Sequence, residues 1–337
     1  MSDPIWVHSR PIERVAIVGG THGNEVNGVA LARHLLRHPE LARRDTFETK
    51  VLLHNLAAVK KNVRYVEEDL NRCYFLKDLT DSGRKMTLEA TRAKEINELL
   101  GPKGVNPHTD LIIDLHNTTA NTGVALMMPP KDELSHAIGA HLIAHDPTVR
   151  IVNFTAGKPD YPMLPTVARH GMTFEVGAAA WGCIDGALFQ QSLKLIMLAL
   201  DYVHGHNLAI SAGDASAWAK ASVPVYEAVR TVDYPRYEDG TISAMCHPAI
   251  QGNDFCEVRR GDPIFLSMGG EPIGFEPKEE DAGETTYPFF VNEAAYYEKG
   301  IAFMVAHRAE QSVRVLSHVP AREVEEAASR ATKKPRT

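Results

Sequence analysis

The stretch RVAIVGGTHGNEVNG, residues 14–28, decides the fold of this chain. Residues 15–18 are a short, continuous apolar run, which is typical of a strand buried on both faces. Gly19 and Gly20 follow, where a backbone without Cβ can turn sharply, and a helical period begins at Val26. The stretch therefore predicts a buried parallel strand, a tight turn and a helix, which is how an α/β fold begins.

Two predicted strands end in residues that can bind a metal. His22 and Glu25 follow the first strand, and the apolar run DLIIDLH, residues 110–116, ends in His116. Parallel α/β sheets gather their sites at the carboxyl ends of strands, so we expect these side chains to converge. Two imidazoles and one carboxylate suit zinc, whose catalytic sites use three protein ligands and one water. The H-x-x-E spacing alone would favour a polar loop without metal, and the second strand changes that balance.

Further motifs carry a family resemblance. They are GGTHGNE at residues 19–25, DLNR at 69–72, DLHNTTAN at 114–121, EVG at 175–177 and VNEAAYYEK at 291–299. Over roughly residues 12–305 the chain resembles the aspartoacylases and aminoacylase-3, a family of carboxypeptidase-like zinc amidohydrolases. The resemblance implies hydrolysis of N-acyl (N-acetyl) L-amino acids to a carboxylate and a free amino acid. It also implies one Zn²⁺ per chain, held by His22, Glu25 and His116.

The resemblance implies roles for residues whose pattern alone would not reveal them. Glu175 matches the catalytic carboxylate, which takes a proton from water and passes it to the leaving amine. Arg64 matches the residue that stabilises the developing oxyanion. Without the resemblance, Glu175 would be interpreted as a salt-bridged core residue and the arginines as surface residues. The implied substrate-binding side chains are Asn71, Arg72, Tyr161 and Tyr296.

Two acidic residues are expected to support the site. Asp114 lies two residues before His116, so both side chains project from one face of the strand. Asp114 can hold the second nitrogen of that imidazole, or it can bond to backbone in the next strand, and both alternatives stay open. Glu293 is expected to position its loop or to pair with an arginine of the pocket. Tyr297, beside Tyr296, is expected to have a packing role.

The chain departs from the family pattern at two places. Aspartoacylases carry an arginine ten residues before the catalytic glutamate, where this chain has Pro165, and Arg169 lies four positions away. An ionised carboxylate is costly to desolvate without a cation, so neutral or aromatic N-acyl amino acids are predicted to be preferred. The alternative is an aspartoacylase that cleaves N-acetyl-L-aspartate, with Arg169 or another arginine reaching the pocket. Residues 178–181, AAAW in place of the family's PQPQ, could supply an apolar wall.

The order of apolar runs predicts the architecture. Strands and helices alternate to about residue 210, which predicts an open, mostly parallel sheet flanked by helices. A helix is expected over residues 161–170 and a long one over 185–204. The small residues at 207–219 indicate a boundary between a zinc-dependent amidohydrolase domain, residues 1–210, and a β-rich domain, residues 220–310. Residues 311–337 are predicted to be a charged, disordered tail.

Composition limits the possible partners. The formal net charge of −7 argues against binding to nucleic acid or to an anionic membrane. The chain has no apolar run of about 18 residues and no signal-like start, so a soluble, cytoplasmic protein with a small-molecule substrate is expected. Its four cysteines lack C-x-x-C spacing and are predicted to be free thiols. The oligomeric state, a homo-oligomer included, stays open.

Two other functions would share some of these motifs. A nucleotide-binding loop would begin at the same glycines, but GGTHGNE lacks both the Lys-Ser/Thr of a P-loop and the G-x-G-x-x-G order. A non-catalytic zinc-binding protein is the remote alternative. The presence of Glu175 and of the arginines argues against it.

Overall fold

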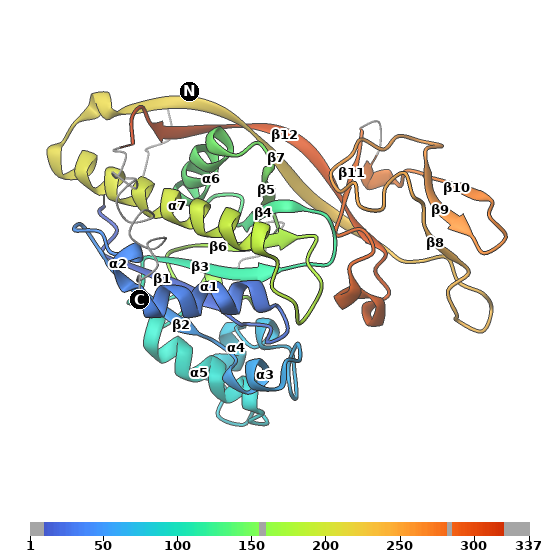
Figure 1. Ribbon diagram of the computed structural model, residues 1–337, viewed down its shortest axis with the longest axis horizontal. Helices are drawn as coiled ribbons and strands as arrows, with labels where there is room; N and C mark the ends of the chain where they lie inside the picture. Colours follow the sequence, from blue (N-terminus) through green and yellow to red (C-terminus); the bar gives the residue numbers. More distant parts are fainter. Residues whose placement is uncertain (1–9, 155–159, 282–284, 320–337) are drawn as a thin grey trace, which may run out of the picture.

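The computed structural model, which describes residues 10–154, 160–281 and 285–319, is built on one nine-stranded sheet (Figure 1). Its strands are β1 (Arg14–Gly19), β2 (Glu48–Leu53), β3 (Leu111–Asn117), β4 (Gly123–Met128), β5 (Val149–Asn153), β6 (His170–Gly177), β7 (Trp218–Val232), β11 (Tyr287–Phe289) and β12 (Phe303–Leu316). They lie in the order β11-β12-β7-β5-β4-β6-β3-β1-β2. Five of the eight pairings are parallel, which confirms the predicted mostly parallel sheet.

Helices cover both faces of the sheet (Figure 1). One face packs against α1 (Val26–Arg37), α6 (Glu133–His145) and α7 (Gly186–Ala212). The other packs against η1 (Leu70–Arg72), α4 (Leu76–Thr80) and α5 (Leu88–Leu100). The short helices α2 (Pro39–Ala42) and α3 (Leu56–Lys61) border β2 in the sequence. Among the described helices, none combines the length and the apolarity that crossing a membrane requires.

Two glycines explain why the first strand, turn and helix pack so closely. Gly20, directly after β1, has φ +77°, a conformation that side chains with Cβ rarely adopt. Gly28 lies in α1 where the helix meets β3, and a Cβ there would stand 2.6 Å from the carbonyl oxygen of Leu115. The glycine at position 28 thus lets α1 lie directly on β3. Because of this contact, the loop that carries His22 and Glu25 is held above the end of β3.

Two helix predictions need correction. The helix expected over residues 161–170 is only the 3₁₀ turn η2 (Leu164–Val167), because Pro162 and Pro165 lack the amide donors of a regular helix. The long helix α7 continues to Ala212, into the stretch predicted as a boundary. Asn207 is buried there, accepting from the Ile12 amide at 2.8 Å and donating to its carbonyl at 2.6 Å.

The sheet also passes through the predicted domain boundary. β7 pairs in parallel with β5, and β12 then pairs with β7 from Phe303 opposite Val232 to Leu316 opposite Trp218. The charged tail predicted from residue 311 therefore begins too early. Val313 and Leu316 are buried in the same core as α6 and α7, and residues 320–337 lie outside the described part of the chain.

The β-rich character of the C-terminal region is confirmed. A three-stranded sheet of β8 (Ala244–Cys246), β9 (Pro263–Ser267) and β10 (Pro272–Gly274) packs around an apolar core that also includes Phe303 and Val305 of β12. In Figure 1 these strands project beyond the end of the large sheet. The 3₁₀ turns η4 (Glu279–Asp281) and η5 (Ala294–Lys299) complete this region, while η3 (Ala215–Ala217) leads into β7.

Candidate functional site

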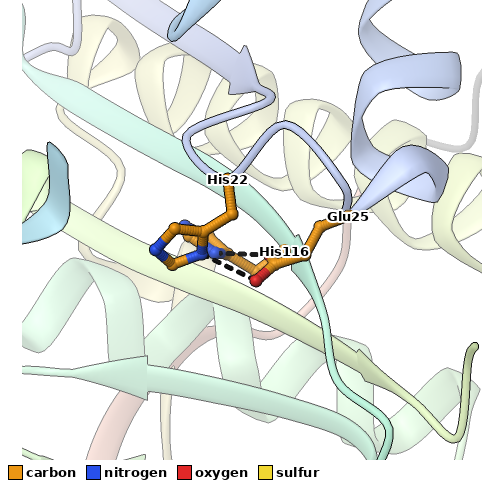
Figure 2. A group of neighbouring side chains, drawn as sticks. All are labelled: His22, Glu25 and His116. Atoms are coloured by element: carbon orange, nitrogen blue, oxygen red, sulfur yellow. Dashed lines mark hydrogen bonds and ion pairs between the residues drawn. The ribbon is translucent and has the colours of Figure 1, made fainter. Parts of the chain in front are cut away.

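Three buried side chains meet where β1 and β3 end (Figure 2). His22 and Glu25 come from the loop between β1 and α1, and His116 comes from β3. One donor atom of each lies within 4.8 Å of the other two. Glu25 contacts both rings, with Oε1 2.6 Å from Nδ1 of His22 and Oε2 2.8 Å from Nδ1 of His116. This set of two nitrogens and a carboxylate, gathered at one point, fits a divalent ion that prefers such ligands.

An aspartate contacts each imidazole at Nε2, the ring nitrogen that faces away from Glu25. The Nε2 atom of His22 is 3.0 Å from Asp69 Oδ1, and Nε2 of His116 is 2.8 Å from Asp114 Oδ2. Of the two alternatives for Asp114, the structure thus has the contact to the imidazole. A carboxylate at Nε2 keeps the ring proton there, so that Nδ1 presents its lone pair to the centre of the cluster.

Asp69 is a site residue that sequence reasoning missed. It lies within DLNR, but nothing in the local pattern places it beside His22, which is 47 residues away. Burial alone would raise the pKa of Asp69, yet the charge and hydrogen bond of His22, with Arg64, hold it well below its usual range. Burial also opposes ionisation of Glu25, where His22 and His116 lower the pKa. Both carboxylates are therefore anionic.

Glu175 lies beside His116 because of strand register. β6 runs parallel to β3, with Glu175 directly opposite His116, and Glu175 Oε1 is 4.0 Å from Nδ1 of that ring. Burial raises the pKa of Glu175 to about 8, because it outweighs the opposing charges of His116 and Arg64. A carboxyl group with this pKa can both take up and release a proton near neutral pH.

Arg64 joins the two carboxylates of the cluster. Its Nη1 donates to Glu25 Oε1 at 3.1 Å, and its Nη2 donates to Asp69 Oδ2 at 3.4 Å. The side chain keeps 18% of its surface exposed, so the guanidinium borders the open side of the cluster. The structure therefore brings together five residues from three segments of the chain: His22, Glu25, Arg64, Asp69 and His116.

Of the expected substrate-binding residues, 71 and 72 lie in η1 and 161 lies in a neighbouring loop. Asn71 is buried, and its side-chain oxygen accepts from the Leu164 amide at 3.2 Å, so any contact to a substrate carboxylate would come from its amide nitrogen. Arg72 is exposed, and its Nη1 donates to the Asn71 carbonyl at 2.7 Å. Tyr161 packs edge-on against Phe154, with ring centroids 5.6 Å apart.

Glu293 connects the C-terminal region to the end of β3. Its Oε2 accepts from the amide and hydroxyl of Thr119, at 2.7 and 2.8 Å, and also from the Thr118 hydroxyl and the Ala120 amide. Its Oε1 accepts from the Ala295 amide at 3.0 Å and so caps η5. Of the two expectations for Glu293, these contacts correspond to positioning of the loop.

The two tyrosines of η5 have different surroundings. The Tyr296 ring packs edge-on against Phe290 at 5.6 Å, and burial together with the charge of Glu175 raises its pKa. The Tyr297 hydroxyl donates to Asn292, and its ring lies 5.2 Å from that of Tyr234. Tyr297 is thus a packing residue, as expected, while Tyr296 lies within the electrostatic reach of Glu175 and Arg64.

Pro165 lines a small, largely apolar pocket beside β6. Thr173, two residues before Glu175 and thus on the same face of the strand, belongs to it. No described residue that lines this pocket is charged. The lining residues are Met127, Met128, Pro129, Phe154, Tyr161, Met163, Pro165, Thr166, Gly171 and Thr173.

Arg169 lies at the opposite edge of the sheet. Its Nε is 3.3 Å from Asp110 Oδ1, just before β3 begins. Glu175 lies six positions after Arg169 along β6, or about 20 Å at the rise of a strand. Residues 178–181 lie elsewhere than the Pro165 pocket. They follow the end of β6, where the Ala179 amide donates to the Thr118 carbonyl and the Gly182 amide donates to the Asn24 carbonyl. The apolar wall expected from residues 178–181 is thus not part of the Pro165 pocket.

Comparisons with known proteins agree with this fold. Residues 11–203 match the family model of the succinylglutamate desuccinylase/aspartoacylase catalytic domain, and residues 221–308 match the AstE/AspA barrel-sandwich hybrid domain. A probable aspartoacylase of Trichodesmium erythraeum is 35% identical over 306 residues, covering 91% of this chain and 100% of that protein.

Two mammalian relatives and one solved structure are similar along most of the chain. The N-acyl-aromatic-L-amino acid amidohydrolase (carboxylate-forming) of Homo sapiens is 37% identical over 88% of this chain and 91% of its own length. The aspartoacylase of Mus musculus is 36% identical over 88% of this chain and 93% of its own length. The crystal structure of murine aminoacylase 3 superposes with a TM-score of 0.83 and 33% identity, covering 91% of this chain and 99% of that one. The chain therefore belongs to the succinylglutamate desuccinylase/aspartoacylase family.

Proposed function

We propose that this protein hydrolyses the amide bond of N-acyl L-amino acids, N-acetyl ones in particular, with one zinc ion held by His22, Glu25 and His116. The observation that carries the proposal is the buried cluster of these three residues with Glu175 beside it. Relatives named for N-acyl amino acid hydrolysis support the reaction class. When bound, zinc supplies a Lewis acid that polarises a carbonyl and makes water acidic enough to react near neutral pH.

The side chains around the cluster divide the work of the reaction. Glu175 accepts a proton from the attacking water and delivers it to the nitrogen as the carbon–nitrogen bond breaks. Arg64, whose Nη1 lies 3.1 Å from Glu25, is assigned to donate to the carbonyl oxygen as that oxygen becomes negative. The products are a carboxylate and a free amino acid, so atoms and protons balance with one water consumed.

Substrate binding would involve both parts of the chain. The α-carboxylate of the substrate is assigned to Arg72, the amide nitrogen of Asn71 and the Tyr296 hydroxyl, with Tyr161 beside the side-chain pocket. An arginine fork suits a carboxylate because it can donate two parallel hydrogen bonds. In this assignment the region before about residue 210 supplies the chemistry, and the β-rich region from about 220 supplies Tyr296 and its anchor Glu293.

The proposed preference is for neutral or aromatic substrates. Among the described residues, the side chains around Pro165 include methionine, phenylalanine and tyrosine and no cation that would pair with a second substrate carboxylate. Arg169 is bound to Asp110 at the far edge of the sheet, which supports the inference that it does not serve a second substrate carboxylate. The alternative, an aspartoacylase, would need another cation at the pocket.

The test combines metal analysis with a substrate series. We expect zinc near one equivalent by elemental analysis, and kcat/KM for N-acetyl-L-phenylalanine or N-acetyl-L-tyrosine at least about tenfold above that for N-acetyl-L-aspartate, or about 1.4 kcal/mol. His116→Ala should lose zinc and hydrolysis together, and Arg169→Ala should leave the substrate ratio unchanged. N-acetylaspartate as the best substrate by tenfold would establish the aspartoacylase alternative. Bound zinc without hydrolysis of any N-acyl amino acid would reject the enzyme.

A further inference from the structure

A network of hydrogen bonds begins at Nε2 of His116 and continues into the protein interior. Asp114 Oδ2 holds His116, and its other oxygen, Oδ1, accepts from the Thr21 hydroxyl at 2.6 Å. The same hydroxyl oxygen is 2.9 Å from Nδ1 of His54, and Nε2 of His54 is 2.5 Å from the Tyr74 hydroxyl. Thr21, His54, Tyr74 and Asp114 are all fully buried, so none of these bonds is exchanged for water.

Three members of this hydrogen-bond network lie in or just after three adjacent strands. Asp114 lies in β3, Thr21 follows β1, and His54 directly follows β2. The backbone supports the arrangement, because the His54 amide donates to the Gly19 carbonyl at 3.0 Å. Tyr74 approaches from the loop after η1. The reaction proposed above gives Thr21, His54 and Tyr74 no task.

The donors and acceptors permit only one arrangement of protons when Asp114 is ionised. A carboxylate only accepts, so Thr21 must donate its single hydroxyl proton to Asp114. The Thr21 oxygen can then only accept, so His54 must carry its proton on Nδ1. Nε2 of His54 is therefore an acceptor, and the Tyr74 hydroxyl donates to it. On the other side, His116 must donate from Nε2, which leaves its Nδ1 lone pair for a ligand.

We propose that Thr21, His54 and Tyr74 are positioning residues that hold the Asp114 carboxylate, and through it His116, in the orientation and tautomer needed to bind the metal. This inference rests on the proposed function, because it takes His116 as a ligand. Outer partners of metal ligands commonly act in this way, by fixing the ring and its tautomer.

The electrostatics of the chain agree with a neutral His54. Burial lowers the pKa of His54 to about 3, so the ring stays uncharged over the whole working range of pH. The Asp114 carboxylate is then the one charge in the chain of four residues. A buried carboxylate is stable only when its oxygens are hydrogen-bonded, and Thr21 and His116 supply those bonds.

The first experiment compares Thr21→Val with Thr21→Ser. Valine has the shape of threonine without the hydroxyl, whereas serine keeps it. By competition with a chromophoric chelator, we expect Thr21→Val to bind zinc about 10–100-fold more weakly than wild type and Thr21→Ser to stay within about threefold. At saturating zinc, Thr21→Val should lower kcat with KM little changed. Equal zinc affinity in the two variants would overturn the inference.

The second experiment needs no variant and holds even if Thr21→Val fails to fold. In ¹⁵N-labelled, zinc-loaded wild-type protein, long-range ¹H–¹⁵N NMR should show His54 neutral, protonated on Nδ1 and unprotonated on Nε2. Protonation of His54 on Nε2, or on both nitrogens, overturns the inference. A wild type that binds no zinc overturns the proposed function itself. A wild type that binds zinc as Thr21→Val does overturns only the positioning role.

Discussion

At the scale of single residues, Glu25 and Glu175 show how two neighbouring carboxylates come to differ. Glu25 lies 2.6 and 2.8 Å from the Nδ1 atoms of His22 and His116 and accepts from Arg64, and the charges of the two rings hold its pKa low in spite of burial. Glu175 lies 4.0 Å from His116, but burial has the larger effect on its pKa and raises it to about 8. A permanently ionised carboxylate suits a metal ligand, and one with a raised pKa suits proton transfer.

This contrast leads to a prediction for Glu175→Gln. The amide keeps the size of the side chain but cannot exchange the proton, so we expect kcat to fall by roughly 10²-fold or more. Zinc content should stay at the wild-type level, because the three proposed ligands are intact. Steady-state kinetics and elemental analysis on the same preparation provide the measurement. A near-normal kcat would make Glu175 a structural residue.

At the scale of elements, the close contact of α1 with β3 depends on Gly28. A Cβ at this position would stand 2.6 Å from the Leu115 carbonyl oxygen, so Gly28→Ala forces the helix away from the strand. We expect a loss of about 1–3 kcal/mol in the free energy of unfolding, measured by urea denaturation. Gly186→Ala is the matched control, because nothing lies within 4 Å of a Cβ there. Equal stability of the two variants would contradict the packing argument.

A second element, α5, organises the loop between Arg64 and Asp69 through one carboxylate. Glu89 is fully buried, and its Oε1 accepts from the Val66 amide at 2.7 Å and from Asn55 Nδ2 at 3.1 Å. Its Oε2 accepts from the next two backbone amides, at 3.2 and 3.4 Å. Burial opposes ionisation of Glu89, but these hydrogen bonds lower its pKa overall.

The lowered pKa makes the contribution of Glu89 depend on pH. The pKa of Glu89 in the folded protein lies below the unfolded value of about 4.3. The ionised carboxylate therefore stabilises the fold fully above the unfolded pKa, and this stabilisation is lost as pH falls through the folded pKa. Glu89→Gln should therefore lower the free energy of unfolding by about 1–3 kcal/mol at pH 7, and by less below pH ~4. Urea titrations at several pH values measure this. The exposed Glu98→Gln serves as control, and a pH-independent deficit in Glu89→Gln would reject the assignment.

At the scale of the whole molecule, the long pair of β7 and β12 makes the two regions one structure (Figure 1). The sheet that carries His116 and Glu175 continues through β5 into β7, and β12 returns along it. Glu293 adds a second connection, from η5 to the end of β3. The proposed substrate contact of Tyr296 therefore depends on how firmly the β-rich region is attached.

Glu293→Gln tests this dependence. The amide cannot accept all the donors that now converge on Oε2, so η5 should loosen and Tyr296 should lose its place. We expect kcat/KM to fall about tenfold, or about 1.4 kcal/mol, with zinc binding unchanged. Glu298→Gln, on the exposed side of the same turn, should behave as wild type. Unchanged kinetics in Glu293→Gln would show that the anchor is dispensable.

The sequence by itself determined the parts of this protein that depend on neighbouring residues. The apolar run before Gly19 and the glycine turn predict β1 and α1 correctly, because buried strands and positive φ angles leave local patterns. Polar residues at two strand ends indicated that His22, Glu25 and His116 would converge, because parallel strands align their carboxyl ends. The family motifs indicated the remaining fold, which the structural match confirms.

Only the tertiary structure decided the features that arise between distant segments. Strand register places Glu175 opposite His116, and Asp69 reaches His22 across 47 residues, which no local pattern encodes. The same applies to Arg169, whose partner Asp110 lies 59 residues earlier in the chain, just before β3. The extent of β12 beyond residue 311 likewise depends on burial against α6 and α7. In each case the deciding free energy comes from a partner far along the chain, and that partner is known only once the chain has folded.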